Sequence, residues 1–294
     1  MTSNRLLYAV LIGMGVVWGG VFTLNKIAVS TGYQPFGILL WQLVIGLLLS
    51  VVVLAVQGKL NCISRPVLLL FFGVAVLGTV FPSYVSFRAV QELPAGIIVV
   101  VIALVPLFTL PMALLMGFEK FNWMRFAGIG FGALAVGVLV GPQASLPDAS
   151  KVGFVFLAML APLAYGAEGI FLAWVGNKKL DPVQILYGAN LVGLILVIPL
   201  AFGSQQHFSP VRVWGAAEWA ILWSTVANWL AYLGYIWLIG KAGPIFAAQV
   251  SYLVTGFGIV WAMVVLGESY SAYIWAAIVL MMVGLFLVQP NKSN

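Results

Sequence analysis

Long apolar stretches divide this chain, and short connections rich in Gly, Pro and charged residues separate them. Each stretch is about 20 residues long, the length an α-helix needs to cross a hydrocarbon core about 30 Å thick. The stretches are apolar throughout and do not alternate, which excludes the strands of a membrane β-barrel. The pattern therefore predicts an all-α polytopic membrane protein with ten transmembrane helices, at residues 6–30, 36–56, 67–89, 95–116, 123–140, 152–176, 183–202, 215–239, 245–266 and 271–288.

The composition supports the same class of protein. Hydrophobic residues make up 63% of the 294 residues and charged residues only 7%, with a mean hydropathy of +1.13. A soluble domain could not cover its surface with so few polar groups, so the lipid bilayer is the expected solvent. The first apolar stretch is too long for a signal-peptide core and lacks a small-residue cleavage site, so it is expected to remain as the first span.

The basic residues predict the orientation of the chain. The formal net charge is +6, and with the N-terminus in the cytoplasm nine of the 13 Lys and Arg residues fall on the cytoplasmic side. We therefore expect a bacterial-type cytoplasmic (inner) membrane protein with both termini in the cytoplasm, and no nucleic-acid partner. The cytoplasmic set is Arg5, Lys59, Arg65, Lys120, Arg125, Lys178, Lys179, Lys241 and Lys292, and the opposite set is Lys26, Arg88, Lys151 and Arg212.

The two halves of the sequence repeat. A shift of 147 residues, half the length, places Trp18 on Tyr165 and Pro35 on Pro182. We expect a first five-helix repeat at residues 1–146 and a second at residues 147–294. Because five is odd, the second repeat must be inverted in the membrane, an arrangement typical of alternating access around a midplane site. The alternative is an old duplication that serves packing alone.

Two short motifs resemble those of a known family. Residues 18–22, Trp-Gly-Gly-Val-Phe, resemble the Trp-Gly-x-x-Phe signature of the drug/metabolite transporter superfamily, EamA-type. Residues 267–268, Gly-Glu, resemble that family's entry into its last helix, and residues 117–119, Gly-Phe-Glu, are a looser copy in the first half. The resemblance implies a ten-helix carrier of small metabolites, many of which are amino acids. With an aromatic content of 14%, the chain resembles the aromatic amino-acid exporter branch.

One carboxylate, Glu168, lies deep within a predicted span. It is 16 residues beyond Val152, about 24 Å along a helix, which places it in the cytoplasmic third of the hydrocarbon core. Acidic residues at such depth are costly and usually face protein or a water-filled cavity. Three roles stay open: proton coupling, binding of a substrate ammonium, or a hydrogen bond that closes the inner gate.

Neutral polar and aromatic residues form the other candidate site groups. In the eighth span, Asn228 and Tyr232 share a face with Thr225 and Tyr235, and this stripe should face the bundle interior. It lines a substrate cavity or, alternatively, only joins helices. The predicted substrate-binding residues are Trp18, Asn25, Ser83, Tyr165, Glu168, Asn228, Tyr232, Gln249 and Tyr252, and the predicted gating or coupling residues are Glu168, Pro106 and Pro111, the prolines by kinking the fourth span.

The sequence favours a secondary transporter that exports small neutral or zwitterionic metabolites, above all aromatic and large apolar amino acids, by alternating access. The alternatives are a multidrug or polyamine efflux carrier, which should carry more intramembrane acids, and a non-transporting accessory subunit. No catalytic motif is present, so an enzyme is not expected. With one cysteine, Cys62, and one histidine, His207, no disulfide framework, Cys/His metal site or cofactor is expected. The expected partners are a small molecule and lipid, and the sequence is compatible with a monomer.

Overall fold

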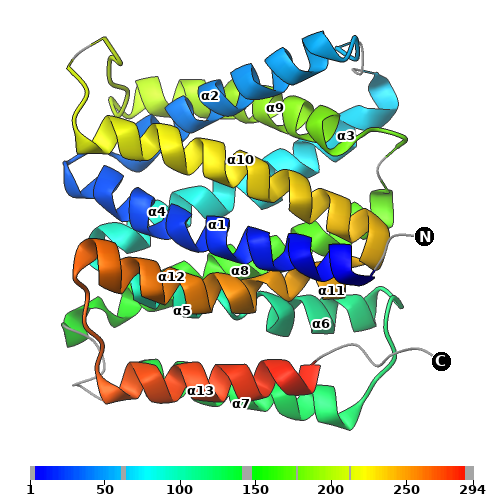
Figure 1. Ribbon diagram of the computed structural model, residues 1–294, viewed down its shortest axis with the longest axis vertical. Coiled ribbons are helices and arrows are strands. Elements are labelled where there is room, and N and C mark those ends of the chain that lie inside the picture. Colours follow the sequence, from blue (N-terminus) through cyan, green and yellow to red (C-terminus); the bar gives the residue numbers. More distant parts are fainter. Residues whose placement is uncertain (1–3, 61–63, 141–147, 177, 212, 289–294) are drawn as a thin grey trace.

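The computed structural model describes residues 4–60, 64–140, 148–176, 178–211 and 213–288, and the regular structure of these residues is helical. The helices run across the molecule side by side, and both ends of the chain lie at the same end of the bundle (Figure 1). The described residues form ten helical spans, as predicted. The first five are α1 (Asn4–Ser30), α2 (Pro35–Val56), α3 (Arg65–Gly73) with η1 (Val74–Val80) and α4 (Phe81–Glu92), α5 (Ala95–Ile102) with α6 (Val105–Leu115), and α7 (Trp123–Val140). After the short turn η2 (Ala149–Lys151), the second five are α8 (Val152–Val175), α9 (Pro182–Gly203), α10 (Ala216–Ala242), α11 (Pro244–Ala248) with α12 (Val250–Leu266), and α13 (Ala272–Val288).

Most of these spans have the length and composition of transmembrane helices. Seven of them, among the described residues, are long and apolar enough to cross a membrane, and α7 and α13 are shorter apolar helices. The helix α10 has 27 residues, and its hydropathy is lower because it carries polar residues such as Glu218, Asn228 and Lys241. The chain is therefore a multi-pass membrane protein.

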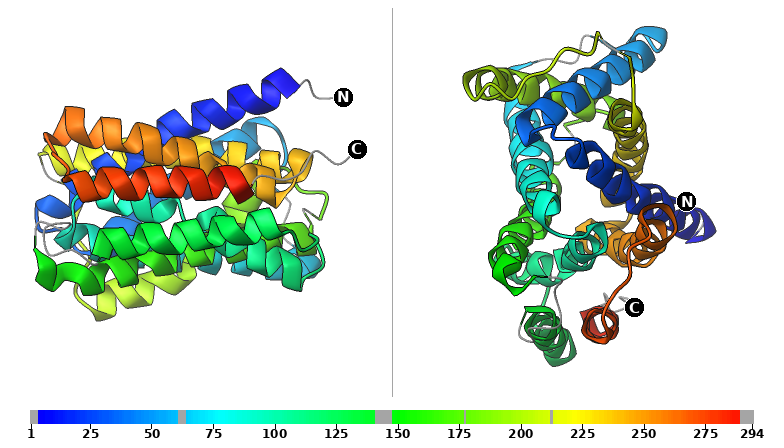
Figure 2. Two further views of the ribbon diagram at one scale, coloured as in Figure 1. Left: turned by 90° about the horizontal axis from the view of Figure 1, so that it is seen from below. Right: turned by 90° about the vertical axis from the view of Figure 1, so that its left-hand side faces the viewer.

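The two five-helix repeats interlock. The second span of each repeat packs on the other, α2 on α9, and the last spans pair in the same way, α7 on α13. The pair α7 and α13 forms one end of the long axis, whereas α1, α8, α10 and α12 lie in the middle (Figures 1 and 2). The first span α1 contacts α10 and α12, and its counterpart α8 contacts α4 and α6. The central helices thus come from both repeats and lie in the middle of the bundle.

Glycines allow the closest of these contacts. A methyl group on Gly19 of α1 would lie 2.7 Å from the backbone nitrogen of Gly258 on α12, so the two backbones touch there. On the other pair, a methyl group on Gly284 of α13 would lie 2.7 Å from the carbonyl oxygen of Gly128 on α7. Small residues that let membrane helices approach in this way take the place of the hydrophobic effect, which is absent between helices in lipid.

The two Gly-Glu motifs end their helices in the same manner. Gly117 and Gly267 adopt φ of +72° and +66°, a conformation in which glycine avoids the strain of a side chain. The backbone N–H groups of Glu119 and Glu268 then reach back to carbonyls of the preceding helix, each 3.3 Å away. The two carboxylates have different partners. That of Glu268 accepts hydrogen bonds from the first backbone N–H groups of α5, at Ala95 and Gly96. That of Glu119 pairs with Arg125. Both acids therefore have structural partners.

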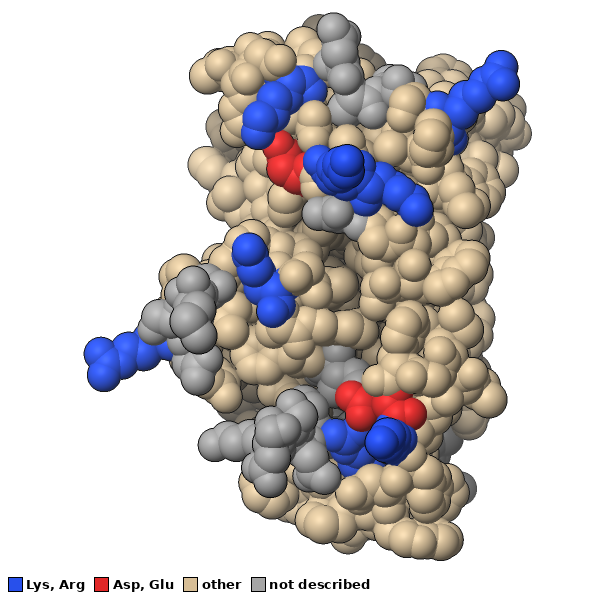
Figure 3. All heavy atoms as spheres, turned by 90° about the vertical axis from the view of Figure 1, so that its right-hand side faces the viewer, with Lys and Arg blue, Asp and Glu red and all other residues tan. Residues whose placement is uncertain are grey.

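Basic side chains gather at the end of the molecule that carries the termini (Figure 3). The connections at this end hold most of the residues predicted to be cytoplasmic, and one of them pairs across the repeats, Lys59 with Asp181 at 3.0 Å. At the opposite end, the ammonium of Lys26 donates to the carbonyls of Val90 and Leu93 and so caps α4. Three residues used in the sequence analysis, Cys62, Arg212 and Lys292, lie outside the described residues.

Candidate functional site

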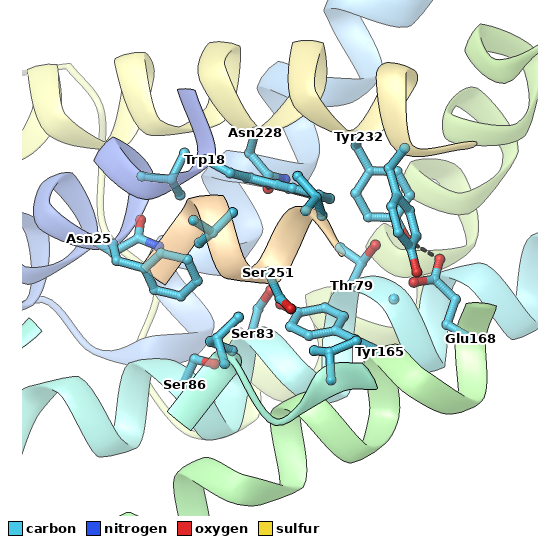
Figure 4. Close-up of a pocket in the computed structure, with 18 of the residues that line it drawn as sticks. Trp18, Asn25, Thr79, Ser83, Ser86, Tyr165, Glu168, Asn228, Tyr232 and Ser251 are labelled. Carbon is cyan, nitrogen blue, oxygen red and sulfur yellow. Dashed lines mark hydrogen bonds between the residues drawn. The ribbon is translucent and has the colours of Figure 1, made fainter. Parts of the chain in front are cut away.

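A cavity lies in the middle of the bundle, between spans of both repeats (Figure 4). Its empty volume is about 900 Å³, counting the part that opens to solvent. Aromatic rings and neutral polar groups dominate its wall, and Glu168 is the charged residue among the described residues that line it. The aromatic residues are Trp18, Phe22, Phe87, Tyr165, Tyr232 and Tyr235, and the neutral polar ones are Asn25, Gln42, Thr79, Ser83, Ser86, Asn228 and Ser251.

Glu168 lies at one end of the cavity, beside Tyr232 (Figure 4). Glu168 is 0% exposed. One carboxyl oxygen, Oε1, accepts a hydrogen bond from the Tyr232 hydroxyl, whereas Oε2 has no hydrogen-bond partner among the described residues. Because a buried polar atom without a partner is costly, it needs an explanation such as a ligand, a proton or water.

The third span changes its winding beside this pair. It winds as a π-helix over η1 and continues as α4 through Pro82. Proline cannot donate to the preceding turn, and such wide turns are frequent at functional sites. Gly78 in η1 lies directly against the Tyr232 hydroxyl and the Glu168 carboxyl, where a methyl group would overlap both. Glycine at 78 therefore allows these two groups to meet at the cavity wall.

Trp18 and Asn228 are joined across the repeats. The indole Nε1 of Trp18 on α1 donates to Oδ1 of Asn228 on α10, at 2.6 Å. The Trp18 ring also packs against those of Tyr232 and Tyr235, with centroids 6.0 and 5.6 Å away. These edge-on and tilted contacts fix the indole, and with it one wall of the cavity.

The far end of the cavity from Glu168 is formed by neutral groups. Gln42 on α2 donates through Nε2 to Oδ1 of Asn25 at 3.2 Å and to Oγ of Ser224 at 3.1 Å. Asn25, Ser83 and Ser86 lie toward this side in Figure 4. The cavity thus has a carboxyl at one end and amides and hydroxyls at the other.

A smaller cavity adjoins the first one between α2, α9 and α10. Its empty volume is about 450 Å³, and it shares Gln42, Ser83 and Asn228 with the larger cavity. Asn190 and Thr225 add polar groups of their own. Thr225, predicted to share the stripe of Asn228 and Tyr232, therefore faces this second space.

Seven of the nine predicted substrate-binding residues line the large cavity, and two do not. Gln249 and Tyr252 lie outside its wall, where Ala248, Val250 and Ser251 take their place. For Gln249 the physical reason is a break in the ninth span: α11 ends at Ala248 and α12 begins at Val250, so this residue belongs to neither helix. Tyr252 lies within α12, and its side chain packs against the main hydrophobic core.

The two prolines of the fourth span lie next to another break. The helix α5 ends at Ile102 and α6 begins at Val105, so that Pro106 sits in the first turn of α6 and Pro111 inside it. A proline in the first turn forgoes no helical hydrogen bond, which explains why the span restarts there. Both repeats therefore have a discontinuous fourth span, and Ile102, Val105 and Val250 at the broken ends line the cavity. A gating role for Pro106 and Pro111 stays a prediction.

Sequence reasoning missed Gln42 and Gly78 as site residues. Gln42 had a usable signal, since it is the one amide in the apolar span 36–56. Gly78 had none, because a lone glycine in an apolar helix is compatible with packing anywhere. Among the described residues, no group of three or more His, Cys, Asp or Glu side chains gathers that could hold a metal ion.

Comparison with known sequences gives a consistent result along the whole chain. The profile of the EamA-like transporter family matches twice, at residues 5–141 and 153–289. The chain is 23% identical over 293 residues to the uncharacterized inner membrane transporter YedA of Escherichia coli (strain K12), covering 97% of this chain and 91% of that protein. The YedA proteins of Escherichia coli O6:H1 and O157:H7 match to the same extent.

Comparison with solved structures supports the fold. A crystal structure of a protein that is 14% identical in sequence superposes with a TM-score of 0.68, covering 97% of this chain and 96% of the other. At this level of identity the likeness concerns the helical architecture alone.

Proposed function

The chain belongs to the EamA-like transporter family, and from that premise we propose that it exports aromatic and other large apolar amino acids across the inner membrane by alternating access. The related YedA proteins carry the name inner membrane transporter, which supports this location. Other small neutral or zwitterionic metabolites with a shape similar to these amino acids would cross by the same route.

The observation that carries the proposal is the chemistry of the central cavity. Six aromatic side chains supply flat apolar area for a large side chain, and amides and hydroxyls supply hydrogen bonds without net charge. A substrate with two opposite charges and a bulky apolar group fits such a lining. A phosphorylated substrate does not, because no Lys or Arg is among the described lining residues.

We assign the substrate ammonium to Glu168. Its Oε2 lacks a partner among the described residues, and an ammonium would supply a charge-assisted hydrogen bond there. The repeat does not duplicate this group, since a shift of 147 residues places Glu168 on Val21. The ammonium end of the substrate then has one place to bind, in one orientation.

The same count of charges disfavours polyamine efflux. A polyamine carries several ammonium groups and needs an acid for each, whereas the described lining holds Glu168 as its charged residue. A multidrug carrier would accept large organic cations that have no carboxylate group. It would therefore transport phenethylamine and larger amines at least as well as amino acids.

We also propose that both termini lie in the cytoplasm. The basic side chains at the end that carries the termini support this orientation (Figure 3). A reporter that works only in the cytoplasm should be active when fused after Asn294, and one that works only in the periplasm should be inactive. The opposite result would reverse the assignment.

The direct test of the proposed function is uptake by proteoliposomes that contain the purified protein. Liposomes preloaded with unlabelled phenylalanine should accumulate labelled phenylalanine by counterflow, and tryptophan, tyrosine and leucine should compete. Glycine, glutamate and lysine should compete poorly, because they lack the apolar group or carry extra charge. Counterflow of none of the amino acids, or equal competition by spermidine, would contradict the proposal.

A further inference from the structure

The bond between Trp18 and Asn228 determines how the Asn228 amide is turned. An indole N–H can donate but cannot accept, so the atom that faces Trp18 Nε1 at 2.6 Å must be the amide oxygen. The oxygen and nitrogen of an asparagine amide are normally assigned from their hydrogen-bond partners, and here the indole permits only one assignment. The amide nitrogen of Asn228, with two N–H donors, consequently points away from Trp18.

Asn228 itself lies at the central space. Asn228 lines both the large and the small cavity, and within the described part of the chain no protein group accepts from its nitrogen. Figure 4 shows Asn228 on the cavity side of α10, between Trp18 and Tyr232. The site therefore presents a preset pair of donors with no protein acceptor.

The position of this amide relative to Glu168 fits a substrate head group. Asn228 and Tyr232 are four residues apart, which puts them on the same face of α10, about one turn or 5.4 Å along its axis. Tyr232 in turn donates to Glu168. Asn228 thus lies one turn of α10 from the residue that contacts Glu168, and all three side chains line the same cavity.

We propose that Asn228 binds the carboxylate of the transported amino acid and that Trp18 is a positioning residue that holds the amide in the donating orientation. This inference rests on the proposed function and names the groups that distinguish an amino acid from the corresponding amine. Neutral N–H donors bind a carboxylate less strongly than Lys or Arg would, and they add no charge that would oppose the ammonium at Glu168.

The test compares phenylalanine with phenethylamine, which lacks the carboxylate, in binding to the purified full-length protein. The wild-type protein should bind phenylalanine more tightly than phenethylamine. Asn228→Asp keeps an acceptor for Trp18 but replaces the donors with a negative charge, so phenylalanine should bind about 10-fold more weakly or worse. Phenethylamine should bind the same variant at least as tightly as wild type, so that the preference inverts.

Two further variants separate positioning from folding. Asn228→Leu has a similar shape but no donors, so it should weaken the binding of phenylalanine and leave that of phenethylamine near its wild-type affinity. Trp18→Phe, which frees the amide to rotate, should weaken the binding of phenylalanine by less than Asn228→Leu does. If each variant weakens both compounds equally, or neither, Asn228 does not bind the carboxylate. If wild type binds no amino acid at all, the proposed function itself has failed.

Discussion

Glu168→Gln should lower the affinity for phenylalanine, and its transport at low concentration, by about 10- to 100-fold. The reason is the loss of charge: a hydrogen bond to a charged group contributes about 1.5–3 kcal/mol, and each 1.4 kcal/mol is about tenfold. Gln keeps the shape of the side chain and can still accept from the Tyr232 hydroxyl. The effect should therefore fall on binding of the ammonium and not on folding. Hydrocinnamate, which lacks the ammonium, should bind the Gln variant no more weakly than wild type.

The matched control removes a carboxylate elsewhere. Asp181→Asn deletes the charge that pairs with Lys59 at the surface, and Asn still caps helix α9, so transport should stay at the wild-type rate. Two other outcomes would assign Glu168 differently. Loss of transport driven by a pH gradient with intact exchange would indicate proton coupling. A Gln variant equal to wild type, with an Ala variant that is worse, would indicate a hydrogen bond that only closes the inner gate.

Gly78→Ala should reduce phenylalanine counterflow by about tenfold or more. The added methyl group overlaps the Tyr232 hydroxyl and the Glu168 carboxyl, and overpacking of this kind typically costs about 1–3 kcal/mol. To relieve it, the carboxyl and the phenol must separate, and the ammonium site at the end of the cavity is lost. The rate should be measured at equal amounts of reconstituted protein.

A second glycine provides the control for Gly78. Gly130 on α7 is exposed, and a methyl group there meets no atom within 4 Å. Gly130→Ala should therefore transport phenylalanine as wild type does. If Gly78→Ala also transports at the wild-type rate, the contact between the third span and the Glu168–Tyr232 pair is not needed for function.

Most of the architecture could be predicted from the sequence, because lipid imposes strong rules on it. Continuous apolar stretches must be helices, and the ten predicted spans agree with the observed helices to within a few residues at most ends. The repeat was visible because residues with special backbone roles, such as Pro35 and Pro182 at the start of α2 and α9, fall at matching positions. Helix breaks were harder to predict: Pro106 signals the break in the fourth span, whereas Gln249 carries no sequence signal of the break in the ninth.

The site was predictable where side-chain chemistry conflicts with lipid. Glu168 and Asn228 stand out in apolar spans, and both line the cavity. Gln249 and Tyr252 do not line it, because spacing along a helix shows which residues share a face but not which face meets the cavity. The contact between Gly78 and Glu168, and the bond between Trp18 and Asn228, join residues far apart in the chain. Only the packing of both repeats brings them together.

The central claim is that the substrate occupies the cavity between the two repeats, and protection of a cysteine in its wall tests it most directly. In a protein with Cys62→Ser, Ser83→Cys places a thiol on the cavity wall with little change in shape. Ile195→Cys, on a side chain of α9 that is 64% exposed toward lipid, is the control. A charged, water-soluble thiol reagent should modify the cysteine at 83 but not the one at 195, and saturating phenylalanine should slow the reaction at 83. If phenylalanine is transported while the reaction at 83 is absent, or proceeds at an unchanged rate, the substrate path lies elsewhere.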